Sequence, residues 1–416
     1  MKPFNIGIIG LGGRGVVLLS SLIKIPELNV AAVCDNDPGR VERYRELCRE
    51  KGLSEPFSTV DYRELLARDL DAVIVSTTWN THVPIAVAAM RAGKHVGIEV
   101  GGALCEQDCW ELVKTSEETG RFCMMLENCC YGDNELTVFN MARQGLFGEI
   151  VHAAGGYEHD LREQIALGGE MRHGRMVNFL HRNGDLYPTH QLGPIAKLLN
   201  INRGNRILSV VSVASKARGV HHWIEKNRPD DSELMRADWK EGDVVTSILR
   251  CAGGETIVLT HACTLPRPYS RDGRIQGTRG LWLEERDAVF VEDDASQTVS
   301  NPDGEHHWSP LSDYKAEYRH PLWVEYDRKG IAKEGHNDMD YLVLCAFADS
   351  LEYGEPPIDV YDTATWMAVT YLSEQSVAMG GTPIPMPDFT SGRWLNRTPE
   401  RRSKYALTEI CREQFE

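Results

Sequence analysis

The sequence lacks the features that mark membrane, secreted and nucleic-acid-binding proteins. No apolar run approaches the ~18 residues that suggest a membrane span, and the N-terminus lacks the separate basic, apolar and small-residue regions of a signal peptide. Basic residues are outnumbered, because 45 Lys and Arg against 61 Asp and Glu give a formal net charge of −16. A general phosphate-backbone binder needs the opposite balance. We therefore expect a cytoplasmic protein that binds neither nucleic acid nor a membrane.

The sequence also lacks the cysteine spacing of common metal and redox sites. It holds 11 cysteines, an odd number, and no Cys-x-x-Cys pair. A zinc site needs ligands at short, regular spacing, and we find no such set. Scattered cysteines in a chain of this size are typical of free thiols in a reducing compartment. No metal site is expected.

The first third of the chain alternates short apolar runs with helical patterns. Strands are predicted at 4–9, 28–34, 72–75, 95–99 and 122–126, and helices at 16–25, 40–51, 83–92 and 106–119. Such alternation implies right-handed crossovers and a parallel sheet. The sequence therefore predicts an α/β fold that begins with a doubly wound Rossmann domain over residues 1–126.

The remainder changes character and predicts an α+β domain over residues 127–416. Strands are expected at 150–156, 207–216, 244–250, 256–264, 274–277, 280–284 and 288–292, and helices at 132–144, 190–199, 338–351 and 362–379. Turns such as Gly253-Gly254 join the strands, which indicates a large, mainly antiparallel sheet. We expect this domain to bind substrate and form oligomers, while its C-terminal helices could pack back on the first domain. The acidic stretch at 291–307 is expected to be a surface excursion.

Three glycines form the strongest motif. Gly10, Gly12 and Gly15 fit G-x-G-x-x-G, follow a predicted strand and open a predicted helix. In that setting the glycines permit a tight turn, backbone approach to a pyrophosphate and close helix–strand packing. Asp35 ends the next strand, where its carboxylate can accept hydrogen bonds from the ribose hydroxyls and would repel a 2′-phosphate. The motif predicts an NAD site in preference to NADP, and the alternative is a glycine-rich turn without a ligand.

Further cofactor contacts are expected outside the carboxyl ends of the other strands, where such sheets bind their ligands. The candidates for these contacts are Thr77, Trp79, Asn80, His82, Glu99 and Asn128. Gly13 and Arg14, which lie between Gly12 and Gly15, are candidates as well. For two of them the alternative is structural, since Trp79 could merely pack and His82 could cap a helix.

The motifs, in order, resemble those of a known family. Segments at 77–82, 127–131, 156–160, 183–190, 202–206 and 267–269 are similar to the glucose–fructose oxidoreductase and inositol dehydrogenase superfamily, and more narrowly to glycoside hydrolase family 109. Two departures from the superfamily's dehydrogenases fit the narrower family. Val100 stands where those dehydrogenases carry a lysine after Glu99, and Leu186 stands where they carry an aspartate four residues before the catalytic histidine. Gln191 departs from the narrower family, which commonly has a glycine there, and so bears on the sugar or aglycone preferred.

The resemblance implies an exo-glycosidase that removes terminal N-acetylgalactosamine, with the α-anomer favoured. Family 109 enzymes are NAD-dependent, and the implied cycle is redox-neutral: oxidation at C3, elimination of the aglycone, addition of water and reduction. NAD would stay tightly bound and return to NAD⁺. A glycosidase with the usual pair of carboxylates is the alternative, but the NAD site would then be idle.

Such a cycle needs bases for the C3 hydroxyl and the C2 hydrogen, and donors that stabilise the enolate. The resemblance assigns catalysis to His190, Tyr187 and Tyr269, and substrate binding to Tyr157, His159 and Glu127. The sequence adds that Pro188 suits the first position of a helix, so Tyr187 and His190 should lie together at a helix N-terminus. Glu127 could alternatively be a structural hydrogen-bond acceptor.

Two other functions stay open. An NAD-dependent sugar or polyol dehydrogenase would accumulate NADH, and a non-catalytic NAD-binding regulator would bind the cofactor without turnover. The expected partner is a glycoside or glycan. An antiparallel sheet with one open face also suggests a homodimer or homotetramer.

Overall fold

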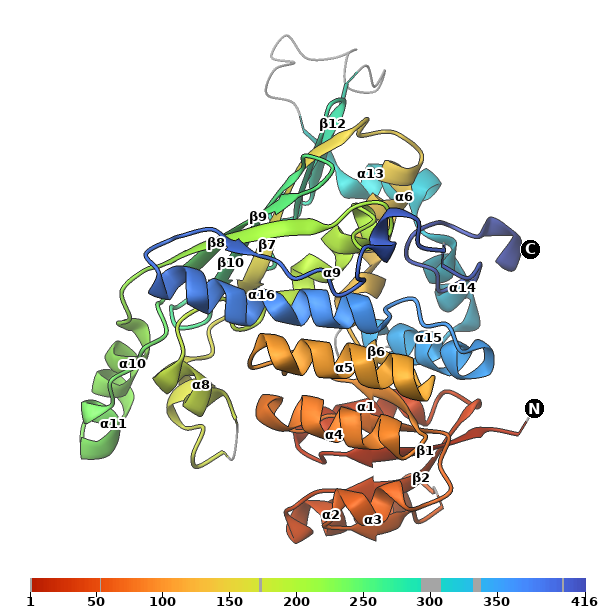
Figure 1. Ribbon diagram of the computed structural model, residues 1–416, viewed down its shortest axis with the longest axis vertical. Coiled ribbons are helices and arrows are strands. Elements are labelled where there is room, and N and C mark those ends of the chain that lie inside the picture. The colour runs from red at the N-terminus through yellow and green to blue at the C-terminus, as the bar shows by residue number, and fades with distance from the viewer. Residues whose placement is uncertain (1, 53, 172–173, 293–307, 332–337, 399) are drawn as a thin grey trace. The chain divides into compact units, whose positions relative to one another are not determined.

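The computed structural model describes residues 2–52, 54–171, 174–292, 308–331, 338–398 and 400–416 (Figure 1). The chain divides into two compact units. The first unit comprises residues 1–132, 329–367 and 400–407, and the second comprises 133–328, 368–399 and 408–416. The predicted division into domains at residue 126 stays a prediction, because each compact unit combines separate stretches of the chain.

A six-stranded parallel sheet organises the first unit. Its strand order is β3-β2-β1-β4-β5-β6. The strands are β1 (Phe4–Ile9), β2 (Leu28–Cys34), β3 (Phe57–Thr59), β4 (Ala72–Val75), β5 (His95–Ile98) and β6 (Cys123–Met125). Every residue of β4 is buried, as expected when helices cover both faces of a parallel sheet. The order reverses between β1 and β4, and ligands bind such sheets at this switch point.

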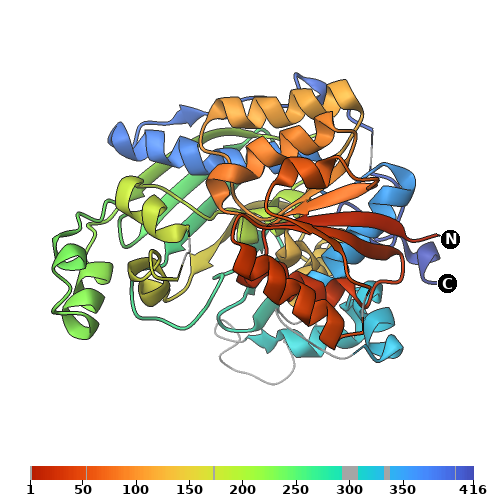
Figure 2. The same cartoon turned by 90° about the horizontal axis from the view of Figure 1, so that it is seen from below.

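Helices lie on both faces of this sheet (Figure 2). They are α1 (Gly13–Leu22), α2 (Pro38–Glu50), α3 (Tyr62–Leu66), α4 (Trp79–Arg91), α5 (Glu106–Thr119) and α15 (Met339–Tyr353), with a short 3₁₀ helix η1 (Asn128–Tyr131). The predicted Rossmann fold is therefore confirmed. Two short elements, β3 and α3, were not predicted because three and five residues are too few to show a period. Helix α4 begins at Trp79, four residues earlier than predicted, although it contains Pro84.

A nine-stranded sheet organises the second unit, with the order β14-β13-β12-β11-β7-β10-β9-β8-β15. Among its described strands only β7 and β10 pair in parallel, so the predicted, mainly antiparallel sheet is confirmed. The strands are β7 (Ile150–Glu158), β8 (Ile207–Ala214), β9 (Val245–Cys251), β10 (Thr256–Ala262), β11 (Arg274–Gly277), β12 (Gly280–Leu283), β13 (Ala288–Val291), β14 (Ser309–Pro310) and β15 (Ile384–Pro385). Gly254, with φ of +102°, turns the chain between β9 and β10 as expected. Most of the stretch expected as a surface excursion, 293–307, lies outside the described residues.

Helices of the second unit complete its core. They are α6 (Asp133–Arg143), α7 (Arg162–Ala166), α8 (Arg175–His181), α9 (Thr189–Leu198), α10 (Gly219–Asn227), α11 (Ser232–Arg236), α13 (Leu311–Tyr318) and α14 (Pro321–Lys329), with 3₁₀ turns η4 (Arg393–Leu395) and η5 (Arg412–Gln414). Helix α16 (Val360–Ala378) belongs to the first unit up to Met367 and to the second from Ala368. Helix α9 packs against β7, where Gly155 leaves room for the side chain of Gln191. A Cβ at Gly155 would lie 1.9 Å from Gln191 Cγ.

No helix among the described residues is long and apolar enough to cross a membrane.

Candidate functional site

The glycine-rich turn in the first unit follows β1 and opens α1. Gly10 has φ of +101°, and a Cβ there would lie 2.5 Å from the carbonyl oxygen of Ser76. A Cβ at Gly15 would lie 2.2 Å from the carbonyl oxygen of Gly10. Both positions therefore require glycine for the fold itself, because backbone atoms cannot give way as a flexible side chain can.

Gly12 and Gly13 differ, because the space beside them is open. A Cβ at Gly12 would meet only Arg40 Nη1, at 3.5 Å, and no described atom lies within 4 Å of one at Gly13. Gly12 is also the N-cap of α1 and offers no side chain to the helix's first N–H groups. An open approach to a helix N-terminus suits an anionic pyrophosphate. These residues thus fit the cofactor that the sequence predicts.

Asp35 lies at the end of β2 and is tied to this turn. Its Oδ2 accepts the Leu11 N–H at 2.7 Å, and its Oδ1 accepts the Asp37 N–H at 2.9 Å. Arg40 Nη1 lies 3.8 Å from the same carboxylate. Each carboxylate oxygen has a second lone pair for a ribose hydroxyl. Asp35 thus both shapes the turn and presents acceptors beside it.

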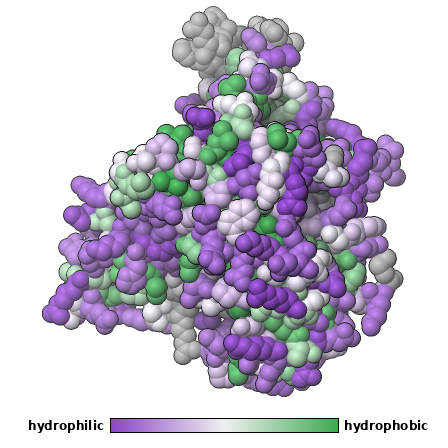
Figure 3. All heavy atoms as spheres, in the orientation of Figure 1, coloured by the Kyte–Doolittle hydropathy of each residue, from purple (hydrophilic) through white to green (hydrophobic). Residues whose placement is uncertain are grey.

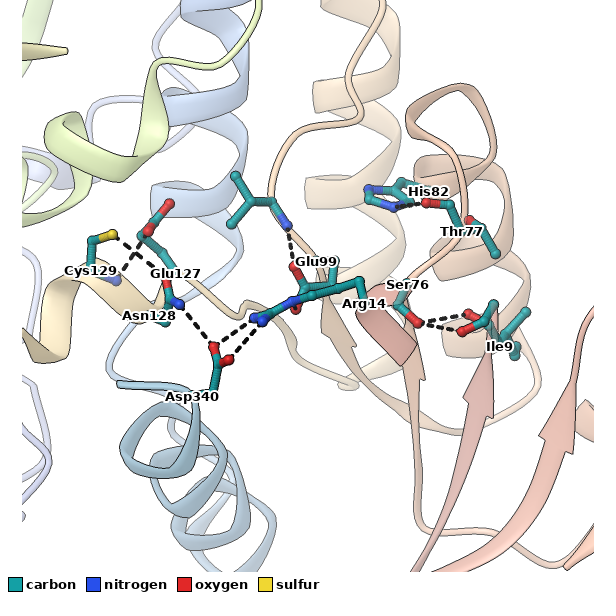
Figure 4. Close-up of polar contacts among 12 residues, drawn as sticks. Ile9, Arg14, Ser76, Thr77, His82, Glu99, Glu127, Asn128, Cys129 and Asp340 are labelled. Carbon is teal, nitrogen blue, oxygen red and sulfur yellow. Dashed lines mark hydrogen bonds and ion pairs between the residues drawn. The ribbon is translucent and has the colours of Figure 1, made fainter. Parts of the chain in front are cut away.

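Arg14 joins two buried carboxylates in the first unit (Figure 4). Its Nε donates to Glu99 Oε1 at 2.8 Å, and its two terminal nitrogens donate to the two oxygens of Asp340 at 2.7 Å each. Asn128 Nδ2 donates to Asp340 Oδ1 at 2.8 Å. Burial raises the pKa of Glu99, while Arg14 opposes the rise. Asp340 was not predicted, since it lies 326 residues from Arg14 and no local motif marks it.

The loop after β4 is shorter than expected, so Trp79, Asn80 and His82 lie in the first turn of α4. Asn80 is exposed and Thr77 and Trp79 are half-buried. Both ring nitrogens of His82 face backbone carbonyl oxygens. Nδ1 lies 3.1 Å from that of Gly101, and Nε2 lies 3.0 Å from that of Thr77 (Figure 4). Burial lowers the pKa of His82. His82 therefore braces this loop, and cofactor contacts for these four residues stay predictions.

The second unit gathers five of the predicted site residues into one aromatic cluster. The cluster consists of Tyr157, His159, Tyr187, His190 and Tyr269. The ring of Tyr157 is central, with centroids 4.6 Å from Tyr187, 5.4 Å from His190 and 6.1 Å from Tyr269. The Tyr157 hydroxyl lies 3.5 Å from His159 Nδ1. Tyr269 is 50% exposed, so the cluster is open on that side.

Local structure explains how these side chains meet. The rings of Tyr187 and His190 are 4.9 Å apart and nearly perpendicular. They flank the start of α9, which begins at Thr189 with Pro188 as its N-cap, one residue before the position predicted for the proline. Their predicted juxtaposition at a helix N-terminus is confirmed. Tyr269 is brought near Tyr157 by the pairing of Glu158 with Ser270.

Arg175 is the charged neighbour that the sequence did not reveal. Its guanidinium carbon lies 5.6 Å from the centroid of Tyr157 and 5.1 Å from that of Tyr187. Burial raises the pKa of Tyr157, and Arg175 opposes the rise. Burial lowers the pKa of His159, and Arg175 lowers it further. A cation facing two phenol rings favours their anionic forms, but no motif surrounds Arg175 at the start of α8.

Glu127 lies in the first unit, as the N-cap of η1. Its side chain is fully buried, and Oε1 accepts the Cys129 N–H at 3.2 Å. This contact is the structural role that the sequence left open for Glu127, and a role in substrate binding stays a prediction.

Two family models match the chain. Residues 4–127 match the family described as "Oxidoreductase family, NAD-binding Rossmann fold", and residues 131–396 match "Glycosyl hydrolase 109, C-terminal domain". The first model agrees with the glycine turn and Asp35, so NAD is the cofactor of this fold.

Relatives and solved structures agree with the two family models. An alpha-N-acetylgalactosaminidase of Tannerella forsythia is 40% identical over 419 residues, covering 94% of this chain and 87% of the relative. A glycosyl hydrolase family 109 protein of Parabacteroides distasonis is 38% identical, covering 95% and 88%. Levoglucosan dehydrogenase, solved with NADH and levoglucosan, has a TM-score of 0.68 at 19% identity, covering 93% of this chain and all of that one. An NAD-binding oxidoreductase from Klebsiella pneumoniae has a TM-score of 0.70 at 18% identity, with the same coverage.

The structural likenesses show the fold, and the sequence matches identify the family within that fold. One family model spans residues 131–396, well over half of the chain, and the relatives align along nearly all of it. The chain belongs to glycoside hydrolase family 109.

Proposed function

We propose that this protein is an NAD-dependent exo-glycosidase that releases terminal N-acetylgalactosamine, with the α-anomer favoured. The aromatic cluster around Tyr157 carries the proposal, because it assembles three tyrosines and two histidines from the end of β7, the start of α9 and the segment at Ser270 that pairs with Glu158. Such groups can bind a sugar ring and move protons near neutral pH. The relative from Tannerella forsythia, named as an alpha-N-acetylgalactosaminidase, supports the substrate.

NAD, when bound, supplies a hydride acceptor for C3 of the sugar. The chain's own residues handle the protons. We assign the proton of the C3 hydroxyl and that of C2 to His190 and Tyr187, whose rings are 4.9 Å apart. Tyr157 and His159 would orient the sugar, and Tyr269 keeps the catalytic role that the resemblance assigns to it. Arg175 would favour negative charge on Tyr157 and Tyr187. The C1–O bond to the aglycone breaks, water adds at C1 and C2 regains a proton. C3 would then regain its hydride from the reduced cofactor and its oxygen would regain a proton, so the sugar ends at its starting oxidation level.

Cofactor contacts are proposed for the first unit. The amides of the turn from Gly10 to Gly15 would hold the pyrophosphate, and Asp35 would accept the ribose hydroxyls. Thr77, Trp79 and Asn80 would line the same site, with His82 supporting them. Arg14, Glu99 and Asn128 would fix its edge, where Arg14 donates to Glu99 and to Asp340, and Asn128 donates to Asp340.

A panel of α- and β-linked nitrophenyl hexosaminides tests the proposal. We expect nitrophenol release from the N-acetyl-α-galactosaminide without added oxidant and without NADH accumulation. His190→Ala should lower kcat by at least ~100-fold, the usual scale for a lost acid–base group. The matched control is His222→Ala on α10, where an exposed histidine pairs only loosely with Glu225. Equal activity of the two variants would contradict the proposal.

The same panel separates the alternative of a sugar or polyol dehydrogenase. The likeness to levoglucosan dehydrogenase favours that alternative at the level of fold, but Val100 follows Glu99 where such dehydrogenases carry lysine. Stoichiometric NADH formation with a free sugar, and no release from glycosides, would support it instead.

We also propose that the protein forms a homo-oligomer through the open face of the nine-stranded sheet. Three large apolar side chains stand exposed on this face of its strands: Val213, Ile248 and Phe290. Ile248 pairs with Val211 and Val258 across β8, β9 and β10, so the face continues across strands. Hydrophobic side chains also interrupt the hydrophilic surface over the strands in the upper part of Figure 3. A cytoplasmic location is proposed too, since none of the 11 cysteines, all of them among the described residues, forms a disulfide.

A further inference from the structure

Buried hydrogen-bond acceptors in the second unit hold the loop that carries Tyr187. The Gly184 N–H donates to Glu241 Oε2 at 3.1 Å, and the Asp185 N–H donates to Ser373 Oγ at 2.8 Å. The Tyr187 N–H donates to Asp185 Oδ1 at 3.3 Å. Asp185, Glu241 and Ser373 are each at most 2% exposed. Side chains, not a helix or sheet ladder, therefore set the path of this loop.

One of these acceptors, Glu241, also contacts β10, the strand that pairs with the strand of Tyr157. The other oxygen of Glu241, Oε1, lies 3.1 Å from Nδ1 of His261, which is 1% exposed. His261 lies on β10 directly opposite Tyr157 on β7. Two residues later, Cys263 Sγ lies 3.6 Å from the Tyr157 carbonyl oxygen. The contacts thus connect the backbone of Tyr157 with that of Tyr187, whose rings lie 4.6 Å apart.

This network is a costly arrangement for stability alone. Asp185 Oδ2 is buried and has no hydrogen-bond partner among the described residues. Burial raises the pKa of Asp185 to about 6 and that of Glu241 to about 7. An apolar core of the same volume would avoid these penalties. Buried ionisable groups with shifted pKa values gather at functional sites more than elsewhere.

We propose that Asp185, Glu241 and His261 form a buried positioning network that holds Tyr187 against Tyr157. The network rests on the proposed function, since it gives the base Tyr187 its place relative to the sugar. None of the three residues touches substrate in this account. They act through the backbone N–H groups of the loop, so their loss should lower kcat more than it raises KM.

Substitution of Asp185 gives the sharpest test. In Asp185→Ala we expect kcat to fall at least ~10-fold and KM to stay within ~3-fold, because misplacement of a base slows the chemical step. Asp185→Asn should keep kcat within ~3-fold of the wild type, because its amide oxygen still accepts the Tyr187 N–H. The melting temperature of Asp185→Ala should not fall by more than about 2 °C, because removal of a buried carboxyl oxygen without a partner offsets the loss of the acceptor for the Tyr187 N–H. A matched control is Asp243→Ala, which removes a buried carboxylate that accepts the Arg218 and Gly219 N–H groups. We expect that control to lose stability and keep its kcat.

A double-mutant cycle with Tyr187→Phe tests whether Asp185 acts through Tyr187. If it does, Asp185→Ala should lower kcat by less than ~3-fold in the Tyr187→Phe background. Independent, multiplicative losses would overturn the proposal. So would a wild-type kcat in Asp185→Ala, or a loss that only follows the unfolded fraction.

A readout without substrate separates this proposal from the proposed function. With 3-fluorotyrosine at position 187, the fluorine resonance should shift or broaden in Asp185→Ala and stay near its wild-type position in Asp185→Asn and Asp243→Ala. If Asp185→Ala does not fold, Ser373→Ala perturbs the same loop more gently and should move the same resonance. An unmoved resonance would overturn the network even if the enzyme is active. A moved resonance in a protein that hydrolyses no glycoside would support the network and contradict only the proposed function.

Discussion

At the scale of the residue, the molecule separates groups that serve the site from groups that serve the fold. Histidines show this best. His190 and His159 lie in the open aromatic cluster, whereas both ring nitrogens of His82 contact backbone carbonyl oxygens. His320 is another buried histidine, and its Nδ1 accepts the Leu322 N–H at 3.1 Å. Residue type alone could not assign these roles, because each depends on which partners the fold supplies.

His320 makes stability depend on pH. Burial, helped by the nearby Arg412, lowers its pKa to about 3. The unfolded chain binds a proton near pH 6.5 and the folded chain does not, so stability is full above that pH and is lost as the pH falls toward 3. From pH 7 to pH 5 this single group should cost about 2 kcal/mol of unfolding free energy.

Denaturant unfolding of the wild type and His320→Gln at both pH values checks this expectation. The glutamine keeps an acceptor for the Leu322 N–H but cannot titrate. The loss between pH 7 and pH 5 should therefore be smaller in the variant by about 2 kcal/mol. Equal losses in the two proteins would show that His320 is not held neutral.

At the scale of the element, the glycine turn divides into positions that the fold needs and positions that the cofactor needs. A Cβ at Gly15 would meet the Gly10 carbonyl oxygen at 2.2 Å, whereas one at Gly12 meets only Arg40 Nη1, at 3.5 Å. Gly15→Ala should therefore lower the unfolding free energy by about 1–3 kcal/mol or more. Gly12→Ala should leave it within about 0.5 kcal/mol and weaken NAD binding at least ~10-fold, because the methyl group occupies the pyrophosphate approach.

Calorimetric NAD titration of stripped protein, alongside thermal unfolding without cofactor, measures both effects. The two variants serve as controls for each other. Normal NAD affinity in Gly12→Ala would contradict the placement of the pyrophosphate at this turn.

Elements with a strong local pattern could be predicted from the sequence, and the others could not. The run Phe4–Ile9 followed by three spaced glycines specifies a strand, a turn and a helix within a few residues. The strand Phe57–Thr59 has no such pattern and forms because β2 offers it a parallel edge. Helix α4 begins at Trp79 although Pro84 lies inside it. The fold here outweighs the local sequence pattern, so the loop before α4 is shorter than predicted.

The candidate site shows the same limit. Tyr187 and His190 could be paired in advance, because Pro188 lies between them at a helix start. Asp340 could not, because its partners Arg14 and Asn128 are hundreds of residues away in sequence. Asp185 lies five residues before His190, yet only the fold reveals that it accepts the Tyr187 N–H.

At the scale of the whole molecule, the open face of the nine-stranded sheet predicts self-association. Ile248 is 47% exposed on β9, between β8 and β10. A charge there would have to be buried in an oligomer, which costs several kcal/mol without a partner. Light scattering after size exclusion should show a dimer or tetramer for the wild type and a smaller species for Ile248→Asp.

The matched control is Val324→Asp, on α14, where the valine is 42% exposed and lies outside the sheet. It should behave as the wild type. A monomeric wild type, or an Ile248→Asp variant of unchanged mass, would contradict the proposed oligomer surface.

The proposed function is a redox-neutral glycoside cleavage that uses bound NAD and the aromatic cluster. The most direct measurement is NMR of the sugar released from nitrophenyl N-acetyl-α-galactosaminide in D₂O. A base that removes the C2 proton exchanges it with solvent, so we expect deuterium at C2 of the released sugar and no accumulated NADH. Release of N-acetylgalactosamine that keeps its original C2 proton would rule out this mechanism.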